Sequence, residues 1–287
     1  MKKMKKMKKF KISRVLVQFG LLFWTAVQLY PMIYMFICSF RDSGSILRDP
    51  FSLPDSFYLE NYIDAWLGNS MTVEYRLQHY FMNSLIITVI SLVLLCLVSM
   101  LAGYSLCRFK FPGYRPIYIG IVCLLAIPAQ ALIVPIFVMM QRLGGLNNIM
   151  SMVPLLITFN LPMSIIIMKT NFEAIPIEIE EAACIDGCTK FRTFWHVSMP
   201  MSRGSIATVT IVNLTSVWSE YMYSSTILML PESRTLPVAV ALFNTNIYNN
   251  TLGPQMAALA ISSLPLMLAY FVFQKQITKG MTLGAIK

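Results

Sequence analysis

Residues 81–107 read FMNSLIITVISLVLLCLVSMLAGYSLC and contain no Asp, Glu, Lys or Arg. A helix needs about 20 apolar residues to cross the hydrocarbon core of a bilayer, so this stretch predicts a transmembrane helix. The whole chain agrees with that prediction: 56% of its 287 residues are hydrophobic and 13% are charged, against about 25% charged in soluble domains. This composition excludes a disordered chain and argues against an ordinary soluble domain.

Further apolar runs lie on both sides of this stretch. Together they predict six spans, at about 15–38, 82–106, 116–140, 149–169, 205–230 and 255–274. The fifth run is interrupted by one charge, Glu220, and the sixth is the later part of an uncharged region that begins at Thr235. We therefore predict an all-α membrane protein with six transmembrane helices.

The positive charges predict the orientation of these spans. The net charge is +10, and eighteen of the 23 Lys and Arg residues fall on one side of the predicted topology. The other side holds Arg41, Arg48, Arg76, Arg142 and Arg234. Cytoplasmic loops retain Lys and Arg, so we expect a multi-pass protein with both termini in the cytoplasm. Its parts are then a basic N-terminus (1–14), a first helix (15–38), an extracytoplasmic loop (39–79) and a core (80–287).

The N-terminal run MKKMKKMKKFK has three possible explanations: a nucleic-acid arm, the start of a cleaved signal peptide, or an orientation signal. The apolar run that follows is longer than the core of a signal peptide, and no A-x-A-like site follows it. Because the lysines adjoin a predicted span, membrane orientation and contact with anionic lipid explain them. We expect a lipid bilayer as partner and no nucleic acid.

Motifs of soluble and intramembrane enzymes are missing from the sequence. It contains no G-x-x-x-x-G-K-[ST], H-E-x-x-H or G-x-S-x-G pattern. Its two histidines, His79 and His196, fall on opposite sides of the predicted membrane, and Cys184 and Cys188 lack the Cys-x-x-Cys spacing of a metal site. We therefore predict no catalytic residue, no metal site and no cofactor bound by the chain itself.

The predicted cytoplasmic loop 171–203 reads NFEAIPIEIEEAACIDGCTKFRTFWHVSMPMSR. Pro176 suits the first turn of a helix, and Gly187 suits the left-handed position at which a helix ends. Glu178, Glu180 and Glu181 fall in the early turns, where the helix dipole favours negative charge. A second amphipathic stretch follows and ends at Pro200, so the loop predicts two helices joined by a glycine.

The charge of this loop favours a protein partner. It has five acidic residues against four basic ones when Lys169 at its edge is counted. The alternative, a helix lying on lipid headgroups, is typical of basic segments, which anionic lipid attracts. A docking surface for another protein is therefore the favoured interpretation.

The loop also resembles a known motif. Glu181-Ala182-Ala183, two residues, Asp186-Gly187, nine residues, then Val197-Ser198-Met199-Pro200 is similar to the EAA loop of bacterial ABC-importer permeases. Further segments resemble the carbohydrate, maltose-permease-like branch of that family: Asn83-Ser84-Leu85, 104–113, Ile127-Pro128-Ala129-Gln130 and 274–287. The resemblance extends over about residues 80–287. Gly204 and Ser219 stand where the family usually has a proline and an asparagine.

This resemblance implies a type I ABC importer permease fold in the bacterial inner membrane. The implied partners are a second homologous permease, two ABC ATPase subunits that bind ATP and Mg, and an extracytoplasmic binding protein that delivers a sugar or oligosaccharide. The loop 171–203 would then be the coupling element seated on an ATPase subunit.

Roles within the loop follow from the resemblance position by position. Glu181 would contact the ATPase, Ala182 and Ala183 would permit close approach, and Asp186 with Gly187 would set the turn. Phe191, Phe194 and Trp195 would anchor the second helix against the membrane domain until Pro200 ends it.

Polar residues inside the predicted spans are candidates for the substrate pathway. Asn213, Ser216 and Glu220 share one helix face, and Trp218 and Tyr221 could stack on a sugar ring. Asn160 and Gln130 are further candidates. The alternative is helix–helix hydrogen bonding for Asn213 and an interfacial aromatic belt for Trp218 and Tyr221.

Two other functions remain open at this stage. One is a permease of the same machinery for another small polar solute. The other is an ion-driven secondary carrier, against which the loop motif and the absence of a detectable inverted repeat both argue.

Overall fold

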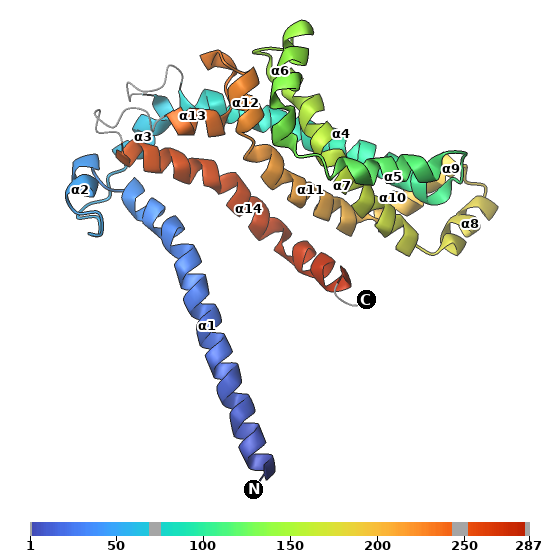
Figure 1. Cartoon of the computed structure of the whole chain (residues 1–287), viewed down its shortest axis with the longest axis horizontal. Helices are drawn as coiled ribbons and strands as arrows, with labels where there is room; N and C mark the ends of the chain where they lie inside the picture. The colour runs from blue at the N-terminus through green and yellow to red at the C-terminus, as the bar shows by residue number, and fades with distance from the viewer. Residues whose placement is uncertain (1, 69–75, 243–251, 285–287) are drawn as a thin grey trace. The chain divides into compact units, whose positions relative to one another are not determined.

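The computed structural model describes residues 2–68, 76–242 and 252–284, and all regular structure within them is helical (Figure 1). The long helices are α1 (Lys2–Ser39), α4 (Leu77–Arg108), α7 (Met152–Ala174), α11 (Arg203–Trp218) and α14 (Leu252–Gly284). The shorter ones are α2 (Ser43–Arg48), α3 (Glu60–Leu67), α5 (Tyr114–Leu124), α6 (Ile133–Arg142), α8 (Ile177–Ile185), α9 (Lys190–Thr193), α10 (Met199–Met201), α12 (Met222–Ile227) and α13 (Leu236–Leu242). Single turns η1 (Ala129–Leu132), η2 (Ile149–Ser151), η3 (Phe194–Ser198) and η4 (Pro231–Ser233) connect them.

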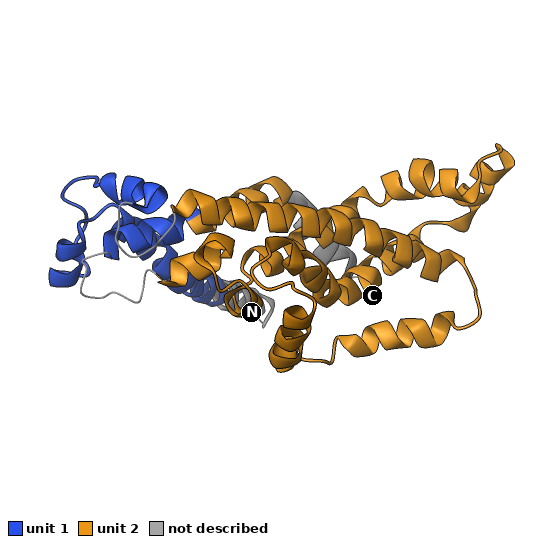
Figure 2. Ribbon diagram, turned by 90° about the horizontal axis from the view of Figure 1, so that it is seen from above, with its two compact units in different colours: residues 1–72, 243–261 blue, residues 73–242, 262–287 orange. Residues whose placement is uncertain are grey.

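The chain divides into two compact units (Figure 2). Unit 1 comprises residues 1–72 and 243–261, and unit 2 comprises residues 73–242 and 262–287. Unit 2 carries both the loop 171–203 and the candidate substrate pathway.

Helices α4, α7 and α11 form the centre of unit 2. Two apolar clusters pack around them. One contains Met152, Leu156 and Ile227 and includes residues of α6 and α12, and the other contains Met168 and Phe172. Gly103 lets α4 approach α7 closely, since a Cβ at this position would lie 2.9 Å from both the Lys169 nitrogen and the Met168 Cβ. Small residues at such contacts are typical of helices that pack within membranes.

Four of the predicted spans are single apolar helices long enough to cross a membrane: Val15–Ser39, Leu77–Arg108, Ile149–Ala174 and Leu252–Gln274. A fifth candidate, Tyr114–Leu124 with Ala129–Arg142, is bent by 92° at its break. The continuous helix predicted over 116–140 is therefore wrong. Pro128 itself is extended at the break, with φ −68° and ψ 121°, and its ring disfavours helical backbone at the preceding Ile127.

The span predicted over 205–230 also differs from a single helix. Helix α11 ends at Trp218, and α12 begins at Met222 after a non-helical Ser219 and Glu220. The Glu220 carboxylate accepts hydrogen bonds from the Tyr223 and Ser224 amides, which starts a new helix in place of continuing the old one. The apolar run predicted a membrane segment but did not reveal this cap.

Unit 1 gives the predicted extracytoplasmic loop a fold of its own over the described residues 39–68. The Arg41 guanidinium is buried and donates to the carbonyls of Ser45, Asp49 and Pro50 at 2.9, 2.7 and 3.3 Å. The buried Asn61 amide donates to the carbonyls of Ser39 and Arg41 at 2.9 and 2.8 Å. Three backbone oxygens, together with the Ser52 hydroxyl, therefore satisfy a buried cation here.

The close approach of α4 and α7 predicts the effect of a single methyl group. Gly103→Ala places that group against the α7 backbone, so we expect it to lower the free energy of unfolding by about 1–3 kcal/mol. Gly120→Ala in α5 is the matched control, because nothing lies within 4 Å of its Cβ position. Thermal unfolding in detergent measures both, and equal unfolding temperatures for the two variants would contradict the proposed close contact.

Candidate functional site

The loop 171–203 forms the predicted helix–glycine–helix unit. Pro176 stands immediately before α8, with φ −56° and ψ 132°, and Gly187 after it has φ +88°. No atom lies within 4 Å of the position that a Gly187 Cβ would take. The glycine is therefore required by the left-handed backbone and not by lack of space.

Glu180 attaches α8 to the rest of unit 2. Its side chain is buried, and its carboxylate accepts hydrogen bonds from the Tyr104 hydroxyl at 3.0 Å, the Arg108 Nε at 3.0 Å and the Ser198 hydroxyl at 2.9 Å. Arg108 also donates from Nη2 to the Ile175 carbonyl at 2.8 Å. We call these four side chains the Glu180 clamp; it joins α8 to the end of α4 and to the η3 turn.

Aromatic packing supports the clamp. Phe194 is buried, with its ring centroid 4.9 Å from that of Tyr104 and 5.2 Å from that of Trp195. Phe194 and Trp195 thus hold the second half of the loop against α4. Phe191 does not, because it is 70% exposed and touches Trp195 with one edge, 6.1 Å between centroids. Within the described residues, no contact therefore supports the predicted anchoring role of Phe191, which stays a prediction.

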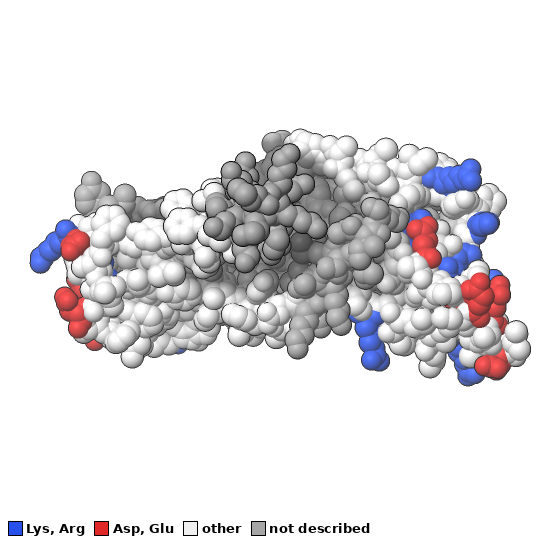
Figure 3. Space-filling model, turned by 90° about the horizontal axis from the view of Figure 1, so that it is seen from below, with Lys and Arg blue, Asp and Glu red and all other residues white. Residues whose placement is uncertain are grey.

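The outer face of α8 and its turn presents most of the remaining motif residues. Glu181, Ala182, Asp186 and Gly187 are exposed, and Ala183 is half-buried. Pro200 does not belong to this face, since it lies half-buried within α10. Ile185 beside them is 87% exposed. Acidic and basic side chains gather at the end of unit 2 that carries α8, on the right in Figure 3. This face combines charge with large exposed apolar side chains.

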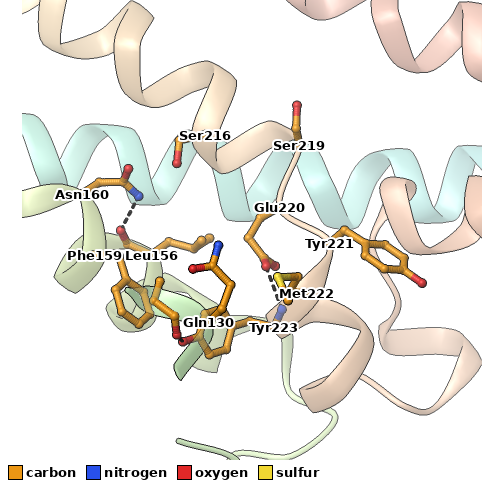
Figure 4. A pocket seen from close by; sticks show the side chains of 11 residues that line it. Gln130, Leu156, Phe159, Asn160, Ser216, Ser219, Glu220, Tyr221, Met222 and Tyr223 are labelled. Carbon is orange, nitrogen blue, oxygen red and sulfur yellow. Dashed lines mark hydrogen bonds between the residues drawn. The ribbon is translucent and has the colours of Figure 1, made fainter. Parts of the chain in front are cut away.

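A second site is a cavity of about 300 Å³ between η1, α7 and the α11–α12 break. Its lining includes the predicted pathway residues Asn160, Ser216, Glu220, Tyr221 and Gln130, and also Ala129, Leu156, Phe159, Ser219, Met222 and Tyr223. Gln130, Asn160 and Glu220 reach it from three different elements, whereas the Tyr221 ring points away from them (Figure 4).

Two predicted pathway residues lie outside this cavity lining. Asn213 is buried and donates to the Ser164 hydroxyl at 2.9 Å and the Val209 carbonyl at 2.6 Å. Trp218 is buried, donates to the Ser262 carbonyl at 3.0 Å and meets the Phe81 ring edge-on at 5.5 Å. Both side chains therefore hold helices together, which is the alternative that the sequence left open for Asn213.

Glu220 and Tyr223 shape the cavity. The Glu220 carboxylate accepts from the Tyr223 amide at 2.7 Å, the Ser224 amide at 2.9 Å and the Ser224 hydroxyl at 2.7 Å. Tyr223 stacks on Phe159 with centroids 5.1 Å apart and donates its hydroxyl to the Ala129 carbonyl. These contacts fix one wall of the cavity.

Neither site is arranged to bind a metal. Among the described residues, no group of three or more His, Cys, Asp or Glu side chains could hold an ion.

Comparison with known proteins identifies the family. Residues 96–283 match the family described as the binding-protein-dependent transport system inner membrane component. The chain belongs to this family.

Individual relatives match the chain over most of its length. It is 32% identical over 268 residues to the diacetylchitobiose uptake system permease protein NgcG of Streptomyces coelicolor, covering 93% of this chain and 87% of that protein. It is 28% identical to the trehalose/maltose transport system permease protein MalG of Thermococcus litoralis, in a match that covers 96% of this chain and 98% of that protein. A crystal structure of a bacterial ABC transporter involved in the import of the acidic polysaccharide alginate shares the fold, with a TM-score of 0.78 and 23% identity. The match covers 92% of this chain and 96% of that one.

Family membership confirms the resemblance drawn from the loop motif. As a binding-protein-dependent transport component, the chain is a transport subunit of the inner membrane and not an enzyme. The clamp residues Glu180, Tyr104 and Arg108 and the cavity residues Phe159 and Tyr223 were not among the predicted site residues. Tyr104 and Arg108 were noted only as part of the segment 104–113 that resembles the family. Hydropathy also cannot show which of Glu178, Glu180 and Glu181 is buried.

The clamp predicts different behaviour for two neighbouring glutamates. Glu180→Gln removes the charge that Arg108 faces in a buried site, so we expect faster amide exchange across 177–198. Glu181→Gln, on an exposed carboxylate, should leave exchange unchanged. Hydrogen–deuterium exchange of the purified chain measures both, and equal protection in the two variants would exclude the clamp as what holds α8.

Proposed function

We propose that this chain is a permease subunit of an ATP-driven ABC importer that moves a sugar or oligosaccharide into a bacterial cell. ATP and Mg bind to two partner ATPase subunits, and an extracytoplasmic binding protein delivers the substrate to this chain and a second, homologous permease. Both termini and the loop 171–203 lie in the cytoplasm. The family supports the binding protein, and the names of the relatives support the saccharide.

The Glu180 clamp is the observation that carries this proposal. It fixes the inner side of α8 to α4 while Glu181, Ile185 and Phe191 are exposed on the outside. A loop that only connected two spans would have no need of a buried ion pair on one side and uncovered apolar side chains on the other. A groove of an ATPase subunit is the surface that these outer residues fit.

The same contacts suggest how force reaches the membrane. A partner that moves α8 also moves α4, because Arg108 and Tyr104 belong to α4 and bond directly to Glu180. Helix α4 in turn packs closely on α7 at Gly103. Closure and opening of the ATPase subunits would therefore rock this group of helices between outward-facing and inward-facing arrangements.

Gly187 offers a test of coupling that is separate from assembly. Gly187→Val places a β-branched residue at φ +88°, at a strain of about 1–3 kcal/mol. We expect ATP hydrolysis by the reconstituted complex to lose its dependence on substrate-loaded binding protein. Uptake should fall at least about tenfold if the strain lowers the coupling free energy by about 1.4 kcal/mol or more.

Gly187→Asn is the matched control, because asparagine tolerates left-handed backbone far better than valine. It should retain most of the coupled uptake. Wild-type coupling in the valine variant would contradict a role for this turn.

Uptake by cells tests the substrate class. A strain that lacks this chain should lose uptake of at least one radiolabelled saccharide from a panel of maltose, trehalose, diacetylchitobiose and arabino-oligosaccharides, and the restored gene should recover it. Unchanged uptake of every saccharide, or uptake driven by a sodium or proton gradient without ATP, would overturn the proposal.

A further inference from the structure

The cavity at the α11–α12 break has a distinctive charge. Among the described residues that line it there is one carboxylate, Glu220, and no Lys, Arg or His. The other polar side chains are the amides of Gln130 and Asn160 and hydroxyls that include Ser216. These groups donate and accept hydrogen bonds without carrying charge.

The shape and lining of the cavity suit a sugar unit. Its volume of about 300 Å³ is at the lower end of small-molecule sites, which span about 300–1,000 Å³. The stacked pair Phe159 and Tyr223 supplies an apolar aromatic wall on one side. Amides and a carboxylate from other elements supply partners for hydroxyl groups.

The position of the cavity agrees with a transport pathway. It lies where a predicted span is broken, and non-helical backbone at membrane depth is tolerated where it lines a cavity or is buried in protein. Hydrogen bonds also fix both sides of the break. The Glu220 carboxylate accepts from two amides in the first turn of α12, and the Trp218 indole donates to the Ser262 carbonyl.

We propose that this cavity is a saccharide subsite of the permease that admits neutral sugar units and rejects carboxylated ones through the charge of Glu220. This inference rests on the proposed function and adds the substrate class of one site. A uronate in the cavity would bring a second negative charge close to Glu220 with no cation in the lining to offset it. At an effective dielectric constant of about 20, two such charges about 6–12 Å apart within the cavity lower affinity by about a hundredfold to tenfold.

Glu220 has a second role that the experiment must separate. Its carboxylate caps α12, so a substitution could act by loosening that helix alone. Glu220→Gln removes the charge, but its single side-chain oxygen can keep only one of the two amide bonds, because Oε1 accepts from Tyr223 and Oε2 from Ser224. Ser224→Ala therefore serves as the control for a weakened cap, because it removes one hydrogen bond to Oε2 and leaves the charge.

Direct binding to the purified complex of permeases and ATPase subunits, without binding protein, tests the subsite. Saturation-transfer NMR compares three neutral disaccharides, maltose, trehalose and diacetylchitobiose, with the carboxylated disaccharide digalacturonate. In the wild type we expect at least one neutral disaccharide to bind at least about tenfold more tightly than digalacturonate.

Three substitutions then test the cause of this preference. Glu220→Gln should reduce the preference at least about tenfold, whereas Ser224→Ala and the exposed Glu232→Gln should retain it. If the Glu220 variant fails to assemble, Ser216→Lys provides an independent test, because a cation on this exposed lining residue should let digalacturonate bind.

The outcomes separate this inference from the proposed function. Equal binding of digalacturonate and neutral disaccharides in the wild type, or a preference unchanged by both Glu220→Gln and Ser216→Lys, overturns the charge-selective subsite. The chain then remains a saccharide permease if its deletion abolishes saccharide uptake. Deletion without effect on any saccharide overturns the proposed function itself.

Discussion

The buried pair of Glu180 and Arg108 is the constraint on which the working part of this molecule depends. A carboxylate removed from water needs a cation and further donors, and here Arg108, Tyr104 and Ser198 supply them from α4 and η3. Breaking such a pair by removing one partner typically costs about 3–5 kcal/mol, because the other charge is left buried without a partner. These contacts join α8 to α4 and leave the outer residues of α8 exposed.

The same argument explains why the loop combines two kinds of glutamate. Glu180 is buried and holds the helix, while its neighbour Glu181 is exposed. Successive residues of an α-helix point about 100° apart, so the two side chains lie on different faces. The aromatic residues divide in the same way: Phe194 is packed against Tyr104 and Phe191 is exposed. One side of the loop thus belongs to the fold and the other is available to a partner.

Much of this architecture could be predicted from the sequence, for clear physical reasons. Charge-free runs identified four continuous spans, because length and hydropathy alone decide whether a helix can cross a bilayer. The motif spacing led to the family, and Gly187 does adopt a left-handed backbone. The broken segments were missed, since the Pro128 bend and the Glu220 cap are local backbone events that average hydropathy does not register. Asn213 and Trp218 stayed open between the pathway and helix packing or an aromatic belt, because sequence gives the face of a helix but not which neighbour covers it.

Unit 1 shows a different way to build a durable loop. Its central arginine, Arg41, donates to the carbonyl oxygens of residues 45, 49 and 50 and to the Ser52 hydroxyl, and every residue type carries such a carbonyl oxygen. The three carbonyl contacts therefore depend on the course of the backbone, and only the contact with Ser52 depends on the type of side chain. Replacement of Arg41 would remove the donor shared by all four oxygens, so a single side chain holds α2 together with the residues that follow it.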